Sequence, residues 1–293
     1  MWRDLAHHRP VLMLLLVWGA GCIDPTPATP LPDAVPEPTP VPVRIATWNL
    51  RQFPASPEAP GRFAAAVQAL DVDLLAVQEV EDADAFAQLL QALPAFEGVL
   101  GPPQAGSSPL RVGVLWRRDR LSLVDQRELF TTSTALFPRP PVRVDFEVVD
   151  TDSRFTAINV HLKAGTGGED EQQRIDSAHV LASEIDAIVA AGEDEVILLG
   201  DFNEAFTDPR AAEFFGVFEA RAGTRVLTRA LDDAGQITFL PAKLVLDHMV
   251  TTSGLDEELH GQTAQAVTHP AWEPDGAAAL SDHRPVRVET TFR

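Results

Sequence analysis

The sequence predicts an α/β fold in which two β-sheets pack together and helices cover the outside. Short apolar runs typical of strands alternate with helical periodicity from Val43 to the C-terminus. Polar motifs at 200–203 and 281–283 lie directly beside such runs, as expected at the rim of an α/β sheet. The chain has 293 residues and 45% apolar content, which suffices for one large domain with a sizeable core.

The predicted elements begin with two strand and helix pairs. In chain order these are a strand at 43–50, a helix at 62–70, a strand at 73–80 and a helix at 83–93. Phe63, Val67 and Leu70 share one face of the first helix, which is the spacing of a helix that packs on a sheet. The two strands are apolar along their length, so we expect both to be buried.

Sequence typical of strands follows, and then one long helix. The strand signals are apolar or alternating runs at 112–116, 142–149 and 155–162. The helix extends over 172–191 and ends at Gly192, a plausible C-cap. Its predicted apolar stripe consists of Ile175, Ala178, Ala182, Ile185 and Val189. Three further strands are predicted at 196–199, 244–251 and 286–291.

The N-terminus is typical of a targeting segment. Arg3 and Arg9 precede an apolar stretch over 11–18, and the small residues 19–21 suit a signal peptidase. The stretch is too short to span a bilayer. We therefore expect residues 1–21 to be a signal peptide and the protein to be exported.

Cys22 is the only cysteine of the chain and follows the small residues directly. Bacterial lipoprotein precursors carry their acylated cysteine at such a position, so Cys22 is a candidate lipid anchor, although Gly19 stands where those signals usually have Leu. A leftover signal-peptide cysteine in a secreted protein is the alternative. Residues 22–42 contain eight prolines and predict an extended tether before the folded domain at 43–293.

The chain is strongly acidic. It has 43 acidic and 23 basic residues, a formal net charge of −20. This charge keeps the protein soluble and repels polyanions at long range, so tight and non-specific binding of nucleic acid is not expected. We expect a monomer, in contact with a membrane only through the possible anchor at Cys22.

Polar side chains lie at or beside the ends of the predicted strands. They are Asn49, Glu79, His161, Asp201, Asn203, Asp247, Asp282 and His283. This set offers oxygen ligands and imidazole but no thiolate. Oxygen ligands suit a hard cation such as Mg²⁺, with Mn²⁺ or Ca²⁺ as alternatives, and zinc is less well matched. The strand ends therefore predict a metal-assisted active site.

Six motifs in order carry a family resemblance. They are Thr47-Trp48-Asn49-Leu50, Val77-Gln78-Glu79-Val80, Asn159-Val160-His161-Leu162, Gly200-Asp201-Phe202-Asn203, Leu246-Asp247-His248 and Ser281-Asp282-His283. Together they resemble the motif series of the endonuclease/exonuclease/phosphatase superfamily, from about Val43 to the C-terminus. The resemblance implies the fold of pancreatic deoxyribonuclease, a four-layer sandwich of two mixed β-sheets flanked by helices, and a divalent-metal-dependent phosphoesterase.

The resemblance also implies roles for these residues. Glu79 would bind the cation, with Asn49 close to it and Asp282 completing or orienting the site. Asp201 would position or deprotonate the attacking water, and Asn203 would hydrogen-bond the scissile phosphate. Asp247 would orient His283, and His283 and His161 would stabilise the phosphoryl charge or serve the acid–base step. In-line attack at phosphorus needs these functions.

Four further features compare this chain with the family or qualify its motifs. Arg139 lies in a segment that resembles one in which the family has an Arg near the substrate phosphates. Leu110 stands near the position where pancreatic-type nucleases have a Glu that supports the first histidine, so His161 is expected to lack a carboxylate partner. The chain has no Tyr, which removes the contacts those nucleases make in the DNA minor groove. His248 points away from Asp247 on an alternating strand, so we assign it a structural role.

The sequence leaves the substrate open, because one fold serves many reactions. A nuclease-like phosphodiesterase acting on DNA or RNA is preferred, with Arg111, Arg139 and Lys163 as basic side chains near the site. A sphingomyelinase or an inositol-phosphate phosphatase of the same superfamily is the alternative. Residues 214–218 are a candidate membrane hairpin, with core packing as the favoured role. A non-catalytic binding module is a further alternative, but the motif set is complete.

Overall fold

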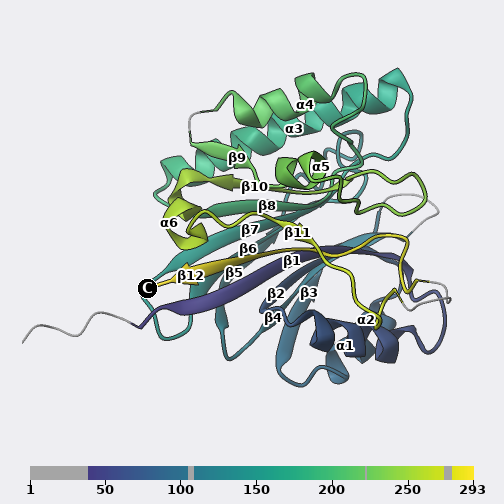
Figure 1. Cartoon of the computed structure of the whole chain (residues 1–293), viewed down its shortest axis with the longest axis vertical. Helices are drawn as coiled ribbons and strands as arrows, with labels where there is room; N and C mark the ends of the chain where they lie inside the picture. Colours follow the sequence, from purple (N-terminus) through teal and green to yellow (C-terminus); the bar gives the residue numbers. More distant parts are fainter. Residues whose placement is uncertain (1–38, 105–108, 222, 274–278) are drawn as a thin grey trace, which may run out of the picture. The chain divides into compact units, whose positions relative to one another are not determined.

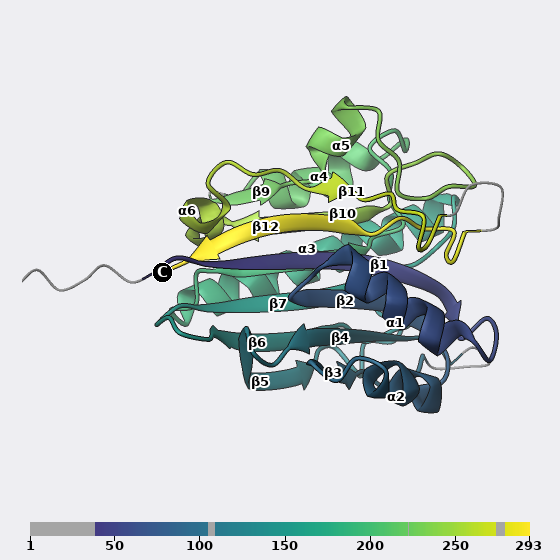
Figure 2. The ribbon, with the colours of Figure 1, turned by 60° about the horizontal axis from the view of Figure 1, so that its bottom comes forward.

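The strands form two sheets that pack face to face, with helices on both outer faces (Figures 1 and 2). The computed structural model describes residues 39–104, 109–221, 223–273 and 279–293, and these form two six-stranded sheets. Pro38–Arg293 form one compact unit. The predicted signal peptide, Cys22 and the tether up to residue 38 lie outside the described residues. No helix among the described residues is long and apolar enough to cross a membrane.

The first sheet contains the N- and C-terminal strands. Its order is β11 (Gln265–Ala266), β12 (Val286–Phe292), β1 (Val41–Phe53), β2 (Leu74–Val80), β4 (Arg111–Arg117) and β3 (Phe96–Leu100). β1 runs parallel to β2 and antiparallel to β12, so the sheet is mixed. β1 begins inside the predicted tether, because Val41 and Pro42 pair with Phe292 and Thr291 of β12.

The second sheet is also mixed. Its order is β5 (Leu121–Glu128), β6 (Val142–Val148), β7 (Arg154–His161), β8 (Val196–Asp201), β10 (Asp247–Thr252) and β9 (Thr224–Val226). β7 and β8 are parallel, and the long helix α3 (Gly168–Ala190) connects them. His161 pairs with Asp201 in the register of these strands, and Asp201 pairs with Asp247 of β10. Three candidate residues are therefore neighbours across one sheet end.

Helices cover the outer faces. α1 (Ala59–Leu70) and α2 (Ala83–Gln91) lie on the first sheet, and α3 and α4 (Ala211–Glu219) lie on the second (Figure 2). Asp82 caps α2, since its carboxylate accepts hydrogen bonds from the backbone N–H groups of Asp84 and Ala85. Short helical segments α5 (Arg229–Asp233), η1 (Ser253–Leu255) and α6 (Asp256–Leu259) lie in the connections.

Three apolar cores correspond to the three spaces between the four layers. The central core joins inward residues of both sheets, such as Ile45 and Leu199. The outer cores lie beneath α1 and α2, around Trp48, and beneath α3 and α4, around Phe202. The strands alternate between these cores, because successive side chains point to opposite faces. This arrangement confirms the predicted four-layer α/β sandwich.

One detail of the long helix differs from the prediction. The expected stripe is buried except at Val189, which is 39% exposed, while Ile188 is 2% exposed and packs on the sheet. Both side chains are apolar, and the burial pattern along α3 continues from Ile185 to Ile188 at a spacing of one helical turn. Gly192 follows the helix end with a φ of +102°, which agrees with its expected capping role.

Candidate active site

The central core becomes polar at one end of the sandwich. Inward positions of the strands there carry Thr47, Asn49, Gln78, Asn159, His161, Asp201 and Asp247, all of which are buried. The same strands carry apolar inward residues further along, such as Ile45 on β1 and Leu199 on β8. Alternation of side chains thus aims the candidate residues into the space between the sheets. Buried polar groups of this kind need hydrogen-bond partners, which the two sheets supply to each other.

Gln78 and Asn159 form the floor of this polar end. Nε2 of Gln78 donates to Thr47 Oγ1 at 2.9 Å and to Asn159 Oδ1 at 2.8 Å. Nδ2 of Asn159 donates to the carbonyl oxygens of Val77 and Gly113 at 2.9 and 2.7 Å. The two amides therefore tie the sheets together beneath the site. Both stand in the quoted motifs, but nothing in the sequence assigns them this role.

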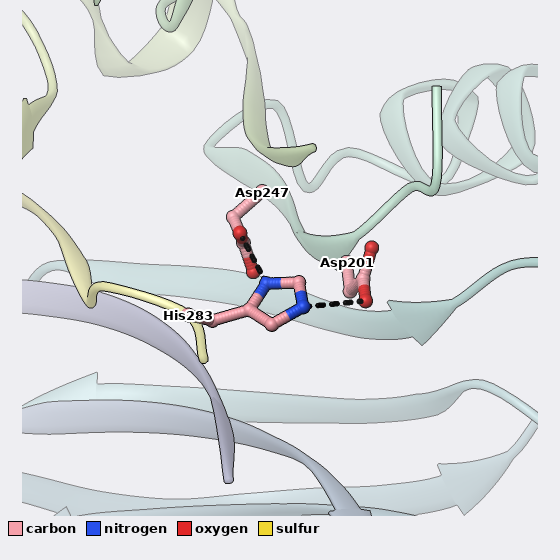
Figure 3. A group of neighbouring side chains, drawn as sticks. All are labelled: Asp201, Asp247 and His283. Atoms are coloured by element: carbon pink, nitrogen blue, oxygen red, sulfur yellow. Dashed lines mark hydrogen bonds and ion pairs between the residues drawn. The ribbon is translucent and has the colours of Figure 1, made fainter. Parts of the chain in front are cut away.

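His283 connects two buried carboxylates (Figure 3). Its Nδ1 lies 2.8 Å from Oδ2 of Asp247, and its Nε2 lies 3.9 Å from Oδ2 of Asp201. Asp247 begins β10 and Asp201 ends β8, so the antiparallel pairing of these strands sets their separation. His283 comes from the loop that precedes β12. Ser281 fixes this loop by donating from Oγ to the carbonyl oxygen of Asn49 at 2.7 Å.

These charges shift the pKa values of His283 and Asp201. Burial favours the neutral imidazole, but the charge and hydrogen bond of Asp247 and the charge of Asp201 outweigh it and raise the pKa of His283 to about 10. Burial raises the pKa of Asp201 to about 6, although the charge of His283 opposes the rise. At neutral pH, the imidazole is therefore charged and the Asp201 carboxylate is close to its titration range.

His161 has the opposite electrostatic setting. Burial, and then the charges of Arg139 and His283, lower the pKa of His161 well below its ordinary value. Its Nε2 lies 3.6 Å from Oδ2 of Asp201 and 3.9 Å from Oε1 of Glu79. Its Nδ1 is buried and has no hydrogen-bond partner among the described residues. The two carboxylates near this ring, those of Asp201 and Glu79, thus lie on its Nε2 side, and Leu110 lines the same cleft.

Asn49 and Glu79 lie next to each other. Nδ2 of Asn49 donates to Oε1 of Glu79 at 3.2 Å and to Oδ2 of Asp201 at 2.9 Å. Oε2 of Glu79 accepts a hydrogen bond from the backbone N–H of Gln52 at 3.0 Å. Glu79 has a φ of +60°, a left-handed conformation that is uncommon for this residue type and typical of functional sites. The surrounding hydrogen bonds hold the carboxylate at the cleft.

Asn203 also has a left-handed backbone, with a φ of +52°. Its backbone N–H donates to Oδ1 of Asp201 at 2.9 Å, and its Nδ2 donates to the carbonyl oxygen of Leu162 at 3.2 Å. Gly200 precedes this turn with a φ of +144°, and a Cβ there would lie 2.0 Å from the carbonyl oxygen of Val160. Only glycine allows β8 to approach β7 so closely. The motif at 200–203 therefore needs its glycine for packing.

The candidate residues share one cleft of about 410 Å³. Its polar lining comprises Arg51, Gln52, Glu79, Arg139, His161, Asp201, Asn203, Asp282 and His283. Phe239 and Leu246 add apolar walls, and the Phe239 ring lies 4.9 Å from the imidazole of His283. The predicted substrate, metal and catalytic residues in this lining thus come together from both sheets. Asn49 and Asp247 lie directly beneath them.

Two arginines reach this cleft in different ways. Arg139 is 7% exposed and donates to the carbonyl oxygens of His161 and Leu162, at 3.1 and 2.6 Å. The side chain of Arg51 is 58% exposed, and its Nε lies 3.6 Å from Oδ2 of Asp282. Arg51 is not among the residues expected from the motifs, although it stands two residues after Asn49. Because Arg51 has a φ of +52°, the chain turns there and directs the residue to the cleft.

Two sets of residues are candidates for a metal site. Ligand atoms of Asp201, Asp247 and His283 lie within 4.8 Å of one another. Both nitrogens of His283 face carboxylates, however, and this arrangement suits a protonated imidazole between two carboxylates better than a metal ion. Glu79 and Asp282 instead offer carboxylate oxygens, and Asn49 would add its amide oxygen, which here accepts a hydrogen bond from the backbone N–H of Arg51 at 2.9 Å. The carboxylates of Glu79 and Asp282 are 22% and 26% exposed and line the cleft. This donor set fits a hard, partly hydrated divalent cation better.

Other residues named from the sequence lie in structural positions. His248 is buried, with Nδ1 2.8 Å from Thr228 Oγ1 and Nε2 2.8 Å from the carbonyl oxygen of Glu204, as its structural role requires. Lys163 pairs with Asp170 at 2.9 Å, and Arg111 donates to the carbonyl oxygen of Glu81 at 2.5 Å. Phe214, Phe215 and Phe218 of α4 are at most 1% exposed, so core packing, the favoured role of residues 214–218, is confirmed.

The chain is similar in sequence to a curated relative. A deoxyribonuclease of Thioalkalivibrio sp. (strain K90mix) is 27% identical over 169 residues, which cover 55% of this chain and 46% of that relative. The chain therefore spans about half the length of this curated relative.

Solved structures share the fold. The human Nocturnin catalytic domain with bound sulfate anion superposes with a TM-score of 0.67 at 21% identity, over 86% of this chain and 94% of that one. An endonuclease/exonuclease/phosphatase family protein from Bacteroides thetaiotaomicron superposes with a TM-score of 0.64 at 20% identity, over 87% and 96%. The model of the Endonuclease/Exonuclease/phosphatase family matches residues 46–283. With its fold, its site and this match, the chain belongs to the endonuclease/exonuclease/phosphatase family.

Proposed function

We propose that this family member is an exported, divalent-metal-dependent phosphodiesterase that hydrolyses nucleic acid. The observation that carries the proposal is the charged His283, which lies between Asp247 and Asp201 at the base of a cleft lined by oxygen donors. The charged imidazole of His283 can stabilise negative charge on the phosphate, and the neighbouring Asp201 carboxylate, with its near-neutral pKa, can act as a base. Hydrolysis of a phosphodiester needs both.

The proposed reaction is in-line attack of water on phosphorus. Asp201 accepts the proton of the water, for which its pKa of about 6 is well matched at neutral pH. The oxygen–phosphorus bond to the water forms and the bond to the leaving oxygen breaks. The leaving oxygen takes up a proton from a solvent water, and Asp201 returns the proton it accepted to solvent. His283 donates a hydrogen bond to a phosphoryl oxygen as negative charge develops, and the second N–H of Asn203 is available to another.

Asn49, Glu79 and Asp282 are the residues that would hold the divalent cation, with Mg²⁺ as the preferred ion and Mn²⁺ or Ca²⁺ as alternatives. A bound cation there would neutralise charge on the phosphate oxygens. Glu79 is held for this purpose by Asn49 and by the backbone of Gln52. The exposed Arg51 beside Asp282 adds a positive charge to the same side of the cleft.

Nucleic acid is the preferred substrate. The deoxyribonuclease similarity of 27% identity supports it, and so do Arg51 and Arg139 at the cleft. The net charge of −20 predicts weak binding that depends on salt and on the metal. The buried α4 removes the candidate membrane hairpin at 214–218, which leaves less support for a sphingomyelinase. A binding module is disfavoured by the complete set of catalytic groups.

Export remains part of the proposal. The N-terminal sequence supports a signal peptide at 1–21 and lipidation at Cys22. Expression of wild type and Cys22→Ser in a Gram-negative host, followed by membrane fractionation and fatty-acid labelling, tests this directly. We expect the label on wild type alone and the Cys22→Ser protein in the soluble fraction. A labelled or membrane-bound variant would contradict the anchor.

The decisive experiment measures hydrolysis of duplex DNA, RNA, sphingomyelin, an inositol polyphosphate and bis-(p-nitrophenyl) phosphate. Each substrate is tested with Mg²⁺, Mn²⁺, Ca²⁺ or chelator, and His283→Ala serves as the inactive control. Cleavage of DNA or RNA that chelator and His283→Ala both abolish supports the proposal. Cleavage of only sphingomyelin or only the inositol polyphosphate would show that this compound, and not nucleic acid, is the substrate. The absence of any turnover would favour the binding module.

A further inference from the structure

Behind the cleft lies a buried ion pair that the proposed reaction does not use. Nε of Arg174, on α3, donates to Oε2 of Glu204 at 2.5 Å, and both side chains are 1% exposed. Burial of two charges costs solvation free energy that the ion pair only partly offsets, and apolar residues of similar size often serve stability as well. The presence of the ion pair at this position therefore points to a role other than stability.

Arg174 joins the connections that follow two strands of the site. Its Nη1 donates to the carbonyl oxygens of Lys163 and Gly165, at 3.1 and 2.7 Å. These residues follow His161, the last residue of β7. Glu204 follows Asn203, in the turn after β8. One guanidinium thus holds both turns, and its planar fork of donors suits several acceptors at fixed angles.

Glu204 is also held from the other side. Its backbone carbonyl accepts a hydrogen bond from Nε2 of His248 at 2.8 Å, and Nδ1 of His248 lies 2.8 Å from Thr228 Oγ1. Burial lowers the pKa of His248 to about 4, so the ring is neutral. Because a carbonyl only accepts, Nε2 carries the proton. His248 adjoins Asp247 in β10, so this chain of contacts links three strands of the site.

Asn203 lies between the two turns that Arg174 holds. It adopts a left-handed backbone directly before Glu204, and its side chain donates to the carbonyl oxygen of Leu162. Both neighbouring turns are therefore fixed by Arg174. A shift of either turn would move the Asn203 amide relative to Asp201, which accepts its backbone N–H at 2.9 Å.

We propose that Arg174 and Glu204 are positioning residues that hold Asn203 and His161 in the orientation needed for phosphoester hydrolysis. This inference rests on the proposed function for its kinetic consequence but not for its structural one. Loss of the ion pair would let the turns at 163–165 and 203–205 move while the sheets stay intact. Misplacement by about 1 Å costs up to about a hundredfold in turnover.

The experiment uses the full chain with the substitutions Arg174→Met, Glu204→Met and both together. The single variants leave one buried charge unpaired and are expected to lower the melting temperature, whereas the double variant removes both charges and restores it. Arg143→Met is the matched control, because Arg143 pairs with Asp145 and Glu184 away from the cleft. The readouts are melting temperature, kcat and KM for bis-(p-nitrophenyl) phosphate, and amide hydrogen exchange.

A positioning role predicts that the double variant regains the melting temperature but not the turnover. We expect kcat about tenfold to a hundredfold below wild type, KM within about threefold of it, and faster exchange at 163–165 and 203–205. A double variant with wild-type kcat and exchange would overturn the proposal. Wild type that hydrolyses no phosphoester would refute the proposed function instead, and the exchange experiment would still decide whether Arg174 holds the turns.

Discussion

Oδ2 of Asp247 lies 2.8 Å from Nδ1 of His283. Asp247 begins β10 of the second sheet, whereas His283 lies in the loop that leads into β12 of the first sheet. Both side chains are buried, so their charges interact with little screening by water. This contact fixes which nitrogen of the ring faces the cleft and keeps the ring charged. Asp201, on the neighbouring strand, is left as the carboxylate that faces Nε2.

Asp247→Asn should lower turnover about a hundredfold or more, because the charge that orients His283 and keeps it protonated is lost. Without this charge, the pKa of His283 should fall from about 10 toward or below its ordinary value. Activity that depends on the charged ring should then decline at lower pH than in wild type. The pH profile of kcat for wild type and variant measures both effects.

Asp73→Asn is the matched control for this variant. Asp73 is also fully buried and ion-paired, but its partner Arg44 lies five residues before Asn49, toward the opposite end of β1. We expect it to lose stability without a shift of the pH profile. If kcat of the Asp247→Asn protein declines at the same alkaline pH as kcat of wild type, the proposed role of this carboxylate is contradicted.

Glu79→Gln should raise the Mg²⁺ concentration required for half-maximal activity. The substitution keeps one acceptor oxygen, exchanges the other for an amide that cannot accept from Asn49 or Gln52, and removes the negative charge, which is the main attraction for a hard cation. Activity measured across a Mg²⁺ titration tests this, with Glu97→Gln on the exposed face of β3 as control. An unchanged Mg²⁺ requirement would move the metal site away from Glu79.

Local pattern predicted the central strands and the helices α1, α2 and α3 well, because they are buried and strongly apolar or periodic. The edge strand β5, the edge strand β3 and the helix α4 were missed. β5 has mostly exposed residues, and β3 contains Glu97 and Gly98 and is only partly buried, so neither has the continuous apolar signal of a core strand. α4 is apolar around most of its circumference, and such a run does not distinguish a helix from a strand by periodicity.

The convergence of the candidate residues was predictable, because strand ends meet at one edge of a sheet and the ordered motifs lie at strand ends. What joins them was not predictable. The contact of Arg174 with Glu204 depends on the angle at which α3 crosses the sheet, and the floor made by Gln78 and Asn159 depends on the spacing between sheets. Both are tertiary features that no short stretch of sequence encodes.

Arg51→Ala should weaken binding of DNA and reduce the slope of its logarithmic dependence on salt concentration by about 1, as loss of one phosphate contact does. The Arg51 side chain is exposed at the cleft and is the more accessible of its two arginines. Fluorescence anisotropy of a labelled duplex across a salt series measures the slope, in Ca²⁺ with the inactive His283→Ala protein as background. Arg62→Ala, on the exposed face of α1, is the control.

Arg51→Ala should not raise the Mg²⁺ concentration required for half-maximal activity. Arg51 lies 3.6 Å from Asp282, so its removal takes a competing positive charge away from a candidate metal ligand. A salt slope equal to that of wild type, or a higher Mg²⁺ requirement, would show that Arg51 serves the site in another way.

Glu195→Gln should stabilise the protein at alkaline pH. Glu195 precedes β8 at the end opposite Asp201, and its Oε2 is buried without a hydrogen-bond partner among the described residues. Burial, and then the charges of Glu258, Asp194 and Glu193, raise the pKa of Glu195 from 4.5 to about 8. Between these two values the folded state keeps a proton that the unfolded state releases. The free energy of unfolding of wild type should therefore fall as pH rises from about 4.5 to about 8.

The Gln variant cannot ionise and should lose this component of the pH dependence. Its urea midpoint should match wild type near pH 5 and exceed it near pH 8, and each 1 kcal/mol gained should raise the melting temperature by about 2–4 °C. Partial exposure of Glu195 to solvent makes the full shift an upper limit. Glu289→Gln, exposed on β12, should leave the pH dependence unchanged. Parallel stability curves for Glu195→Gln and wild type would mean that the carboxyl group ionises in the folded protein as it does in the unfolded chain.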